Sequence, residues 1–428
     1  MNETMKESIK DFENLLTIMK GFTDGTRNVK ILDNSQTLQI KYNEEEKEVV
    51  IGFEGFDLLK KIFDRHLNKK YRFAYEKYDK YILYMGNLFL ENYFIKESEI
   101  NAGLVSNVVS STNTLLEKDY KSYSIYIPLI FFKIEKNEEI KYGPITIYSI
   151  ENTKITFLQD FLELKANKLF KSIAQIEVKA LSLEFARTRS LQLLKAFLGL
   201  CSILPDCNSP EYLRTYFDDY PKYFQHFFYS DGRQSVEKEK KIEFISTECP
   251  KWQNHLGGQT SYPHVIAEIL TKLSKNNFID FLGLRIFDSL VMYHDAVIEN
   301  NLFYKIPKLF TVIERLIHTE SQSNRVTANI TERKEYLFKI LEESKILNDI
   351  NFSKLYDLRS DIIHGSHSMI KPIPTKDVKD INEITKNLIK VCTCFYFQNG
   401  INETVNDKEI DFLFNKLISF IKNRDSIK

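Results

Sequence analysis

Residues 352–365 read FSKLYDLRSDIIHG and carry both a start and a stop signal for a helix. Ser353 is a favourable N-cap, apolar residues follow at helical spacing, and Gly365 is a natural residue for the C-terminal stop. We therefore predict a helix that ends at His364. Arg359 and His364 occupy its last turns, and their side chains point roughly 140° apart because they are five residues apart on a regular helix.

Similar helical periodicity extends in both directions from this segment. Apolar residues recur at helical spacing from Leu282 to Tyr293 and from Leu309 to Ile317. We predict helices near 263–275, 279–299, 304–320, 332–345, 352–364, 377–398 and 408–422. The pattern indicates an all-helical bundle over residues 263–428.

The first part of the chain has a different pattern, rich in β-branched and aromatic residues. Strand-like runs occur at 30–32, 38–42, 48–53, 124–132 and 145–148, with turn residues such as Asn34 and Asn43 beside the early ones. We predict a β-rich domain over residues 1–165 that contains a helix or two. A β-rich N-terminal domain combined with C-terminal helices indicates an α+β protein.

Residues 166–262 form a predicted helical middle region between these two domains. Its main element is a long helix from Ile176 to Leu204 that stops at Pro205. Residues 230–241 combine turn residues with a run of charges, which is typical of an exposed loop. The chain therefore divides into three predicted regions.

Overall composition restricts the function classes. The chain of 428 residues has 59 basic and 59 acidic residues, so it lacks the global charge of a protein that coats nucleic acid. Five scattered cysteines favour a reducing cytoplasm over a disulfide framework. The charged N-terminus does not resemble a signal peptide, and the apolar runs 125–132 and 196–204 are too short to cross a bilayer. We expect a cytoplasmic protein without a membrane partner.

Arg359 and His364 together suit the cleavage of RNA by its own 2′-hydroxyl group. Histidine moves protons near neutral pH, since its ordinary pKa is about 6.5. The planar arginine side chain can neutralise the phosphate oxygens in the transition state. The spacing of the pair is expected by chance in such a chain, so the hypothesis depends on the surrounding string.

The string Leu-Arg-Ser-Asp-Ile-Ile-His-Gly at 358–365, within its set of helices, resembles the HEPN superfamily and, within it, the Apea-like HEPN domains of bacterial antiviral and abortive-infection proteins. The resemblance covers roughly residues 263–428. It implies metal-independent endoribonuclease activity without a cofactor, with Arg359 and His364 as catalytic residues. Ser360 stands at the polar position after the arginine, where many active relatives have Asn, Asp or His.

The resemblance also implies partners and auxiliary residues. HEPN-like domains typically pair about a two-fold axis, so we expect a homodimer through the C-terminal domain, RNA as substrate, and a phage-derived or protein trigger at the N-terminal domain. The secondary candidates are Glu314, Asp361 and His367. Glu314 lies where relatives often carry an acidic residue that orients the pair, although an exposed helix ion pair explains it equally well.

A purely structural interpretation stays open at this point. Arg359 could pair with Asp357, Asp361 or Glu314, and His364 could satisfy the last carbonyls of its helix. The protein would then be a non-catalytic module that binds a nucleotide, an RNA or a protein, or the antitoxin or adaptor half of a defence pair.

Other candidate sites are weaker. Cys392 and Cys394 point in different directions on a helix, which favours core packing over a metal site. Cys249 lacks the ligand spacing that a zinc site with His255 and His264 would need. The glycines lack the strand-to-helix context and the lysine of a nucleotide-binding loop. The sequence therefore predicts no metal and no nucleoside triphosphate site.

Overall fold

The computed structural model of the chain describes residues 2–23, 37–42, 45–68, 71, 78–130, 134–135, 138–151, 170–205, 207, 213–215, 227–229, 237–239, 255–256, 261–276, 281–319, 326–340, 347, 350–399 and 406–427. The contacts divide it into two units. The first unit contains residues 1–123 and 179–186, and the second contains residues 124–178 and 187–428.

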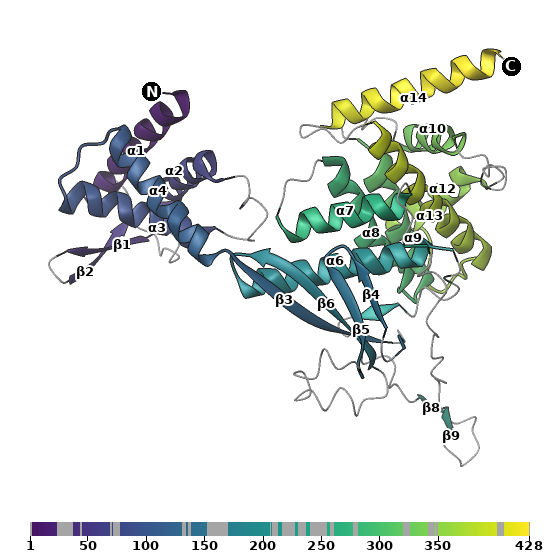
Figure 1. Cartoon of the computed structure of the whole chain (residues 1–428). Coiled ribbons are helices and arrows are strands. Elements are labelled where there is room, and N and C mark those ends of the chain that lie inside the picture. The colour runs from purple at the N-terminus through teal and green to yellow at the C-terminus, as the bar shows by residue number, and fades with distance from the viewer. Residues whose placement is uncertain are drawn as a thin grey trace. The chain divides into compact units, whose positions relative to one another are not determined.

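The first unit is mostly helical (Figure 1). Its helices are α1 (Glu3–Thr23), α2 (Gly52–His66), α3 (Asp79–Leu90), which continues as a π-helical turn (Glu91–Ile95), and α4 (Ala102–Asp119). Strands β1 (Thr37–Tyr42) and β2 (Glu45–Val50) pair antiparallel. A hairpin therefore accompanies the helices.

The core of this unit joins the hairpin to the helices. Phe12 of α1 stacks on Phe89 of α3, with ring centroids 4.1 Å apart, and both rings are fully buried. Leu38 of β1 lies so close to Gly86 that a β-carbon at residue 86 would be 2.8 Å from its side chain. Glycine at residue 86 has no β-carbon, so β1 can approach α3 more closely than any other residue type there would allow.

The prediction of a β-rich domain over residues 1–165 is wrong in its content. The strand predicted at 38–42 is confirmed, but the one predicted at 48–53 ends at Val50, and α2 begins at Gly52. Helices occupy most of residues 3–119, because their apolar residues lie on faces that pack together in one core. The run 30–32 lies outside the described residues.

The strands predicted at 124–132 and 145–148 belong to the second unit, where they form a sheet with residues from the predicted middle region. Its five strands are ordered β4 (Glu139–Tyr142), β5 (Ile145–Ser149), β6 (Phe170–Ala180), β3 (Lys121–Ile130) and β7 (Arg214–Thr215). The pairs β4 with β5, β5 with β6 and β3 with β7 are antiparallel. The sheet therefore crosses the predicted boundary at residue 165.

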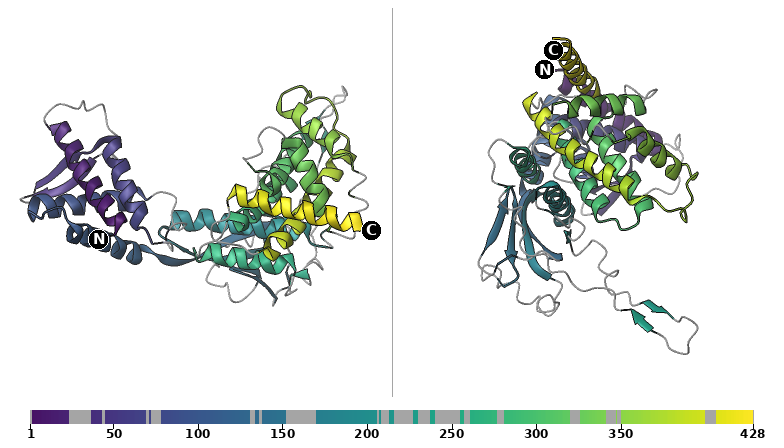
Figure 2. Two further views of the ribbon diagram at one scale, coloured as in Figure 1. Left: turned by 90° about the horizontal axis from the view of Figure 1, so that it is seen from above. Right: turned by 90° about the vertical axis from the view of Figure 1, so that its right-hand side faces the viewer.

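Helix α6 (Leu183–Ile203) lies between this sheet and the helical bundle. The ring of Phe197 is 5.3 Å from that of Tyr142 on β4. A β-carbon at Gly199 would be 2.3 Å from the carbonyl oxygen of Leu290, which lies in α8 (Phe281–Val297) of the bundle. The backbones of α6 and α8 are therefore in direct contact at Gly199. Figure 2 shows the sheet as a layer beside the helices of this unit.

Two details of the predicted middle region need correction. Residues 176–180 belong to β6 and not to the long helix, because their side chains alternate within a sheet that the local sequence does not reveal. Glu237–Glu239, predicted as exposed loop, form strand β9, which pairs with β8 (Phe227–Tyr229). The remainder of 230–241 lies outside the described residues.

The C-terminal bundle contains the predicted helices, most of them with ends within three residues of the prediction. The helix predicted at 332–345 begins and ends six to seven residues earlier, and the last helix extends five residues beyond 422. The helices are α7 (Tyr262–Ser274), α8 (Phe281–Val297), α9 (Leu302–Ile317), α10 (Val326–Phe338), α12 (Phe352–Ile363), α13 (Thr375–Gln398) and α14 (Asp407–Ile427). The predicted apolar faces of α8 and α9 are buried against each other, and α13 packs on both. Helix α12 packs against α9, α10 and α13. The α+β class is therefore confirmed.

Two buried arginines attach α14 to the rest of the bundle. Arg285 of α8 donates to Asp407, with 2.9 Å between Nη2 and Oδ1. Arg333 of α10 pairs with Asp411 and also donates to the carbonyl of Ile317. No helix in the described part of the chain is long and apolar enough to cross a membrane.

Candidate functional site

Helix α12 is capped two residues earlier than the sequence predicted. The side chain of Asn351 accepts a hydrogen bond from the backbone amide of Lys354 at 3.0 Å, so Asn351 is the N-cap and the prediction of Ser353 is wrong. Both residue types suit this position, and the choice depends on where the preceding chain enters the helix. Ser353 lies instead in the first turn.

The end of α12 has a defined C-cap geometry. Gly365 has a φ of 76°, the amide of Gly365 donates to the carbonyl of Ile362, and the amide of Ser366 donates to the carbonyl of Asp361 at 2.8 Å. This pair of hydrogen bonds is a Schellman motif, which favours glycine because of the left-handed backbone. The predicted stop at Gly365 is confirmed, and it fixes the backbone of His364 as the C-cap.

Arg359 is held by an acidic side chain from a neighbouring helix. Its Nη2 atom is 3.1 Å from Oε1 and 3.3 Å from Oε2 of Glu314 on α9. Both side chains are about one-fifth exposed. The guanidinium group also lies 5.5 Å from the ring centroid of Tyr356, and its Nε atom is buried without a hydrogen-bond partner in the described chain. Glu314 thus orients the guanidinium group, but not all of its N–H donors have hydrogen-bond acceptors in the described chain.

Tyr356 supports Glu314 from the other side. Its hydroxyl group is 3.4 Å from Oε1 of Glu314, and its ring packs edge-on against Phe310 at 5.4 Å. Burial and the charge of Glu314 raise the pKa of Tyr356, so the phenol stays protonated and able to donate. Tyr356 was not among the predicted site residues, although its position three residues before Arg359 on a helix indicates contact.

His364 is exposed at the end of α12. Its backbone amide donates to the carbonyl of Ser360 at 2.9 Å, while its imidazole ring makes no hydrogen bond or ion pair with the described residues. Ser360 is half-buried and Asp361 is exposed, and Asp361 contributes its carbonyl to the cap. The ring of His364 is therefore accessible to a ligand.

His367 has a different environment from His364. It is 8% exposed, its Nε2 atom is buried without a hydrogen-bond partner in the described chain, and its ring lies 6.4 Å from that of Phe303 on α9. Its backbone amide donates to the carbonyl of Asp361. His367 therefore packs the loop after α12 onto α9.

The surface around the end of α12 exposes several large apolar side chains. Ile363 is 50% exposed, Met369 is 61% exposed and Ile370 is 94% exposed, and Tyr304 beside Phe303 is 50% exposed. Apolar residues gathered in this way often mark a surface that another molecule covers.

The structure thus brings Glu314 into contact with Arg359, and it does so through an ion pair. The other secondary candidates, Ser360, Asp361 and His367, lie in the same turn and cap but make no side-chain hydrogen bond or ion pair with Arg359. Chemically, the segment offers a fixed cation and an accessible imidazole. A phosphodiester needs such groups for cleavage by its own hydroxyl.

In the described residues, no three side chains of His, Cys, Asp or Glu gather in a way that could hold a metal ion. Cys392 is fully buried, which confirms its predicted place in the core, and burial raises its pKa. Cys249 lies outside the described residues.

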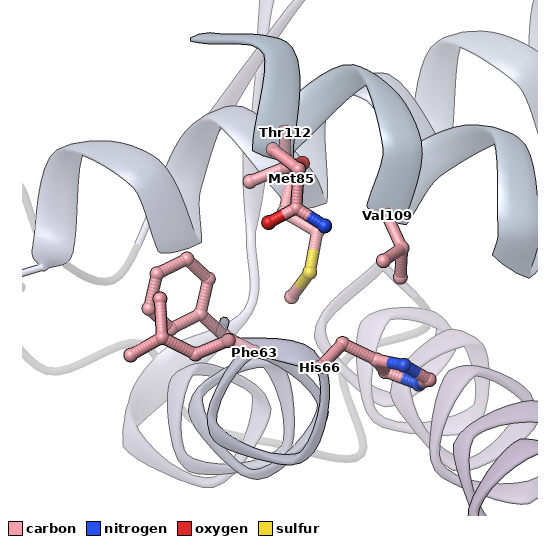
Figure 3. Close-up of a pocket in the computed structure, with 7 residues that line it drawn as sticks. Phe63, His66, Met85, Val109 and Thr112 are labelled. Atoms are coloured by element: carbon pink, nitrogen blue, oxygen red, sulfur yellow. The ribbon is translucent and has the colours of Figure 1, made fainter. Parts of the chain in front are cut away.

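A second histidine with an unusual environment occurs in the first unit. Figure 3 shows His66 and Phe63 of α2 beside Met85 of α3 and Val109 and Thr112 of α4, around a cavity large enough for about one water molecule. The Nε2 atom of His66 is 3.0 Å from the hydroxyl oxygen of Ser8. A serine beside a histidine is the arrangement of an activated nucleophile, so its hydrogen bonds need inspection.

The hydrogen bonds exclude that role for Ser8. Its hydroxyl group donates to the carbonyl of Thr4 at 2.9 Å, so His66 must donate to the hydroxyl and has no free lone pair there to accept its proton. Ser8 is also fully buried. Burial and the charge of Arg65 lower the pKa of His66. The pair is therefore a structural contact.

Comparisons with known proteins do not extend these observations. No family model, no curated protein and no solved structure matches the chain.

Proposed function

We propose that the chain is a metal-independent endoribonuclease of HEPN type, which cleaves RNA through attack of the 2′-hydroxyl group on the neighbouring phosphate. The observation that supports it best is the end of α12, where a carboxylate orients Arg359 and the imidazole of His364 is exposed beyond it. In the bacterial setting of the resembling proteins, it acts as the toxin of an antiphage defence system.

Arg359 stabilises the charge on the phosphate oxygens in this proposal. The ion pair with Glu314 uses Nη2, and Nη1 makes no hydrogen bond or ion pair with the described residues, so the guanidinium group keeps a terminal donor for a phosphate. Glu314 and Tyr356 act as positioning residues, because they fix the direction of the guanidinium plane. Ser360 lies on the face of α12 that His364 shares.

His364 moves the protons. Transphosphorylation requires a base for the 2′-hydroxyl group and an acid for the leaving oxygen, and a second copy of the chain supplies the second histidine. The exposed apolar side chains at Ile363, Met369 and Ile370 support a homodimer whose interface adjoins this site. The first unit, which is joined to the sheet and not part of the bundle, carries the proposed response to a phage or protein trigger.

The ion pair between Arg359 and Glu314 also fits a competing function. A guanidinium group paired with a carboxylate at the surface of a bundle is a common structural contact, and the chain would then be a non-catalytic module that binds RNA, a nucleotide or a protein. The two functions differ in one measurable property, the formation of new RNA ends.

The test is cleavage of RNA by the purified full chain in EDTA. We expect products with a 2′,3′-cyclic phosphate and a 5′-hydroxyl group, and His364→Ala should lower the rate by about 10²–10⁴-fold. His318 is a matched control, because it is the C-cap of α9 as His364 is the C-cap of α12, and His318→Ala should keep full activity. Full activity of a cleanly purified His364→Ala protein would refute the proposal, as would RNA binding without cleavage across substrates.

The dimer has a separate test. Ile370→Lys should shift the protein from dimer to monomer in light scattering without changing its secondary structure, since residue 370 is almost fully exposed within the chain. A wild-type chain that is monomeric at all concentrations, yet cleaves RNA, would exclude the shared cleft.

A further inference from the structure

A second site lies at the opposite end of α12, where a cavity of about 400 Å³ opens between α10 and the first turn of α12. Its walls come from Thr331, Lys334, Glu335, Lys339, Ile350, Asn351, Phe352 and Ser353. Cavities of this size accommodate small organic ligands. A helix of 12 residues is about 18 Å long, so this cavity is well separated from His364.

Lys334 is the most unusual group in this cavity. It is 3% exposed, and it forms no hydrogen bond or ion pair with any residue in the described parts of the chain. Its Nζ atom lies 4.9 Å from the ring centroid of Phe352. Burial lowers the pKa of Lys334, and the nearby charge of Glu335 offsets part of that effect. A buried ammonium group without an ion pair is costly, and an anion within hydrogen-bond distance would relieve the cost.

The first turn of α12 adds donors at the same place. Asn351 accepts from the amide of Lys354, which leaves the amides of Phe352 and Ser353 without an acceptor inside the helix. These amides and the helix dipole favour an anion at this end. The exposed hydroxyl group of Ser353 is a further donor on the cavity wall.

Two further described residues that line the cavity, Lys339 and Glu335, are charged. Lys339 pairs with Asp425 of α14 at 3.3 Å and lies over the ring of Tyr336, so it is less available to a ligand. Glu335 contributes a negative charge. The attraction for an anion therefore centres on Lys334 and the first turn of α12.

We propose that this cavity binds the terminal phosphate group of a small organic ligand of nucleotide size, with Lys334 and the first amides of α12 holding the phosphate. A phosphate dianion matches this set of donors better than a carboxylate does, because it has more charge and one more oxygen atom. The organic part of the ligand occupies the rest of the cavity. The site does not depend on ribonuclease activity.

The test is calorimetric titration of the full chain with inorganic phosphate, adenosine monophosphate and adenosine. The two phosphate-bearing probes should bind saturably and compete with each other, while adenosine should not bind. Lys334→Met should weaken their binding by about 10- to 100-fold, the loss typical of one charge-assisted hydrogen bond. Lys308→Met is the control, because Lys308 pairs with Glu299 on the surface of the same bundle and should bind as the wild type does.

Ser353→Asp tests the same site at an exposed residue, so the core of the bundle is unchanged. A carboxylate in the first turn favours the helix but repels a phosphate, so the protein should stay at least as stable and bind at least ten-fold more weakly. His364→Ala should keep full binding, which separates this proposal from the ribonuclease.

Three results would overturn the site. The first is the absence of saturable binding of either phosphate-bearing probe up to about 10 mM, a concentration that reveals dissociation constants in the millimolar range. The second is binding to Lys334→Met that equals that of the wild type. A dinucleotide that binds equally well with a 5′-phosphate and with a 5′-hydroxyl group would also contradict it, because the backbone of RNA would then be the ligand.

Discussion

The two ends of α12 hold their positive charges in opposite ways. At the C-terminal end, Glu314 fixes Arg359, and both side chains keep some exposure. At the N-terminal end, Lys334 is almost fully buried and has no ion pair with the described residues. A paired arginine can bind a phosphodiester transiently, because its own solvation changes little on binding. An unpaired buried lysine instead favours stable binding of an anion, because the anion supplies the missing counter-charge. One helix thus presents two different anion environments.

Replacement of Arg359 should have the largest effect after that of His364→Ala. Arg359→Lys keeps the charge but loses the planar set of donors, so we expect RNA cleavage to fall by about 10²–10³-fold. Cleavage rates at saturating RNA measure the effect. Arg315→Lys is the matched control, because Arg315 pairs with Asp288 in the same bundle, and it should cleave normally. Equal rates for the two variants would show that both arginines are structural.

Gly365→Ala should disturb only the C-terminal end of α12. A β-carbon at this residue would meet no atom within 4 Å, so the expected loss of about 1–2 kcal/mol comes from the left-handed backbone alone. Hydrogen exchange of the amides from His364 to His367 should become faster. Gly365→Asn should lose less stability than Gly365→Ala, since asparagine adopts the left-handed conformation more readily. Equal exchange rates in the two variants would contradict the idea that backbone strain causes the loss.

Glu314→Gln removes the charge that orients Arg359 but keeps the shape of the side chain. We expect a roughly ten-fold lower cleavage rate, equivalent to about 1.4 kcal/mol, and an unchanged pH profile because His364 is not touched. The surface variant Glu383→Gln, which loses an ion pair with Lys386, serves as the control and should show no change. A shifted pH profile would argue against a positioning role.

Asn351→Ala should weaken the N-terminal end of α12. Loss of the cap to Lys354 is expected to cost about 1 kcal/mol, seen as faster hydrogen exchange in the first turn of the helix. Asn351→Ser should restore most of it. The same exchange rates in Asn351→Ala and wild type would mean that packing alone holds this turn.

Lys334→Met has the smallest predicted effect on stability and the opposite sign. Because the variant removes a buried charge without an ion pair, the ligand-free protein should become more stable by up to about 1 kcal/mol. Thermal unfolding in phosphate-free buffer measures this change. A less stable variant would mean that the ammonium group already has a partner in the free protein.

Much of the C-terminal bundle follows from local sequence. The apolar residues from Leu282 to Tyr293 and from Leu309 to Ile317 predicted two buried helix faces, and both are buried. Gly365 predicted the end of α12 because only the left-handed backbone after a helix requires glycine so strongly. Periodicity and capping are properties of neighbouring residues, so one sequence reveals them.

Other features depended on contacts between distant segments. Residues 176–180 are strand because they continue β6, which lies between β5 and β3 in the sheet. Helices α1 to α4 pack around one shared core, although the β-branched and aromatic residues of this region favour strands. The sequence proposed Glu314 as a partner of Arg359 but left Asp357 and Asp361 equally open, and only the packing of α9 against α12 selected it.

The sequence by itself determined the helices of the bundle, the stop at Gly365 and the two basic residues beside it. The tertiary structure alone decided that Arg359 has a carboxylate partner, that His364 is exposed while His367 is buried, and that Lys334 is buried beside the start of α12. The reason is physical: backbone periodicity and capping act over a few residues, whereas burial and charge pairing arise between helices that are far apart in the chain.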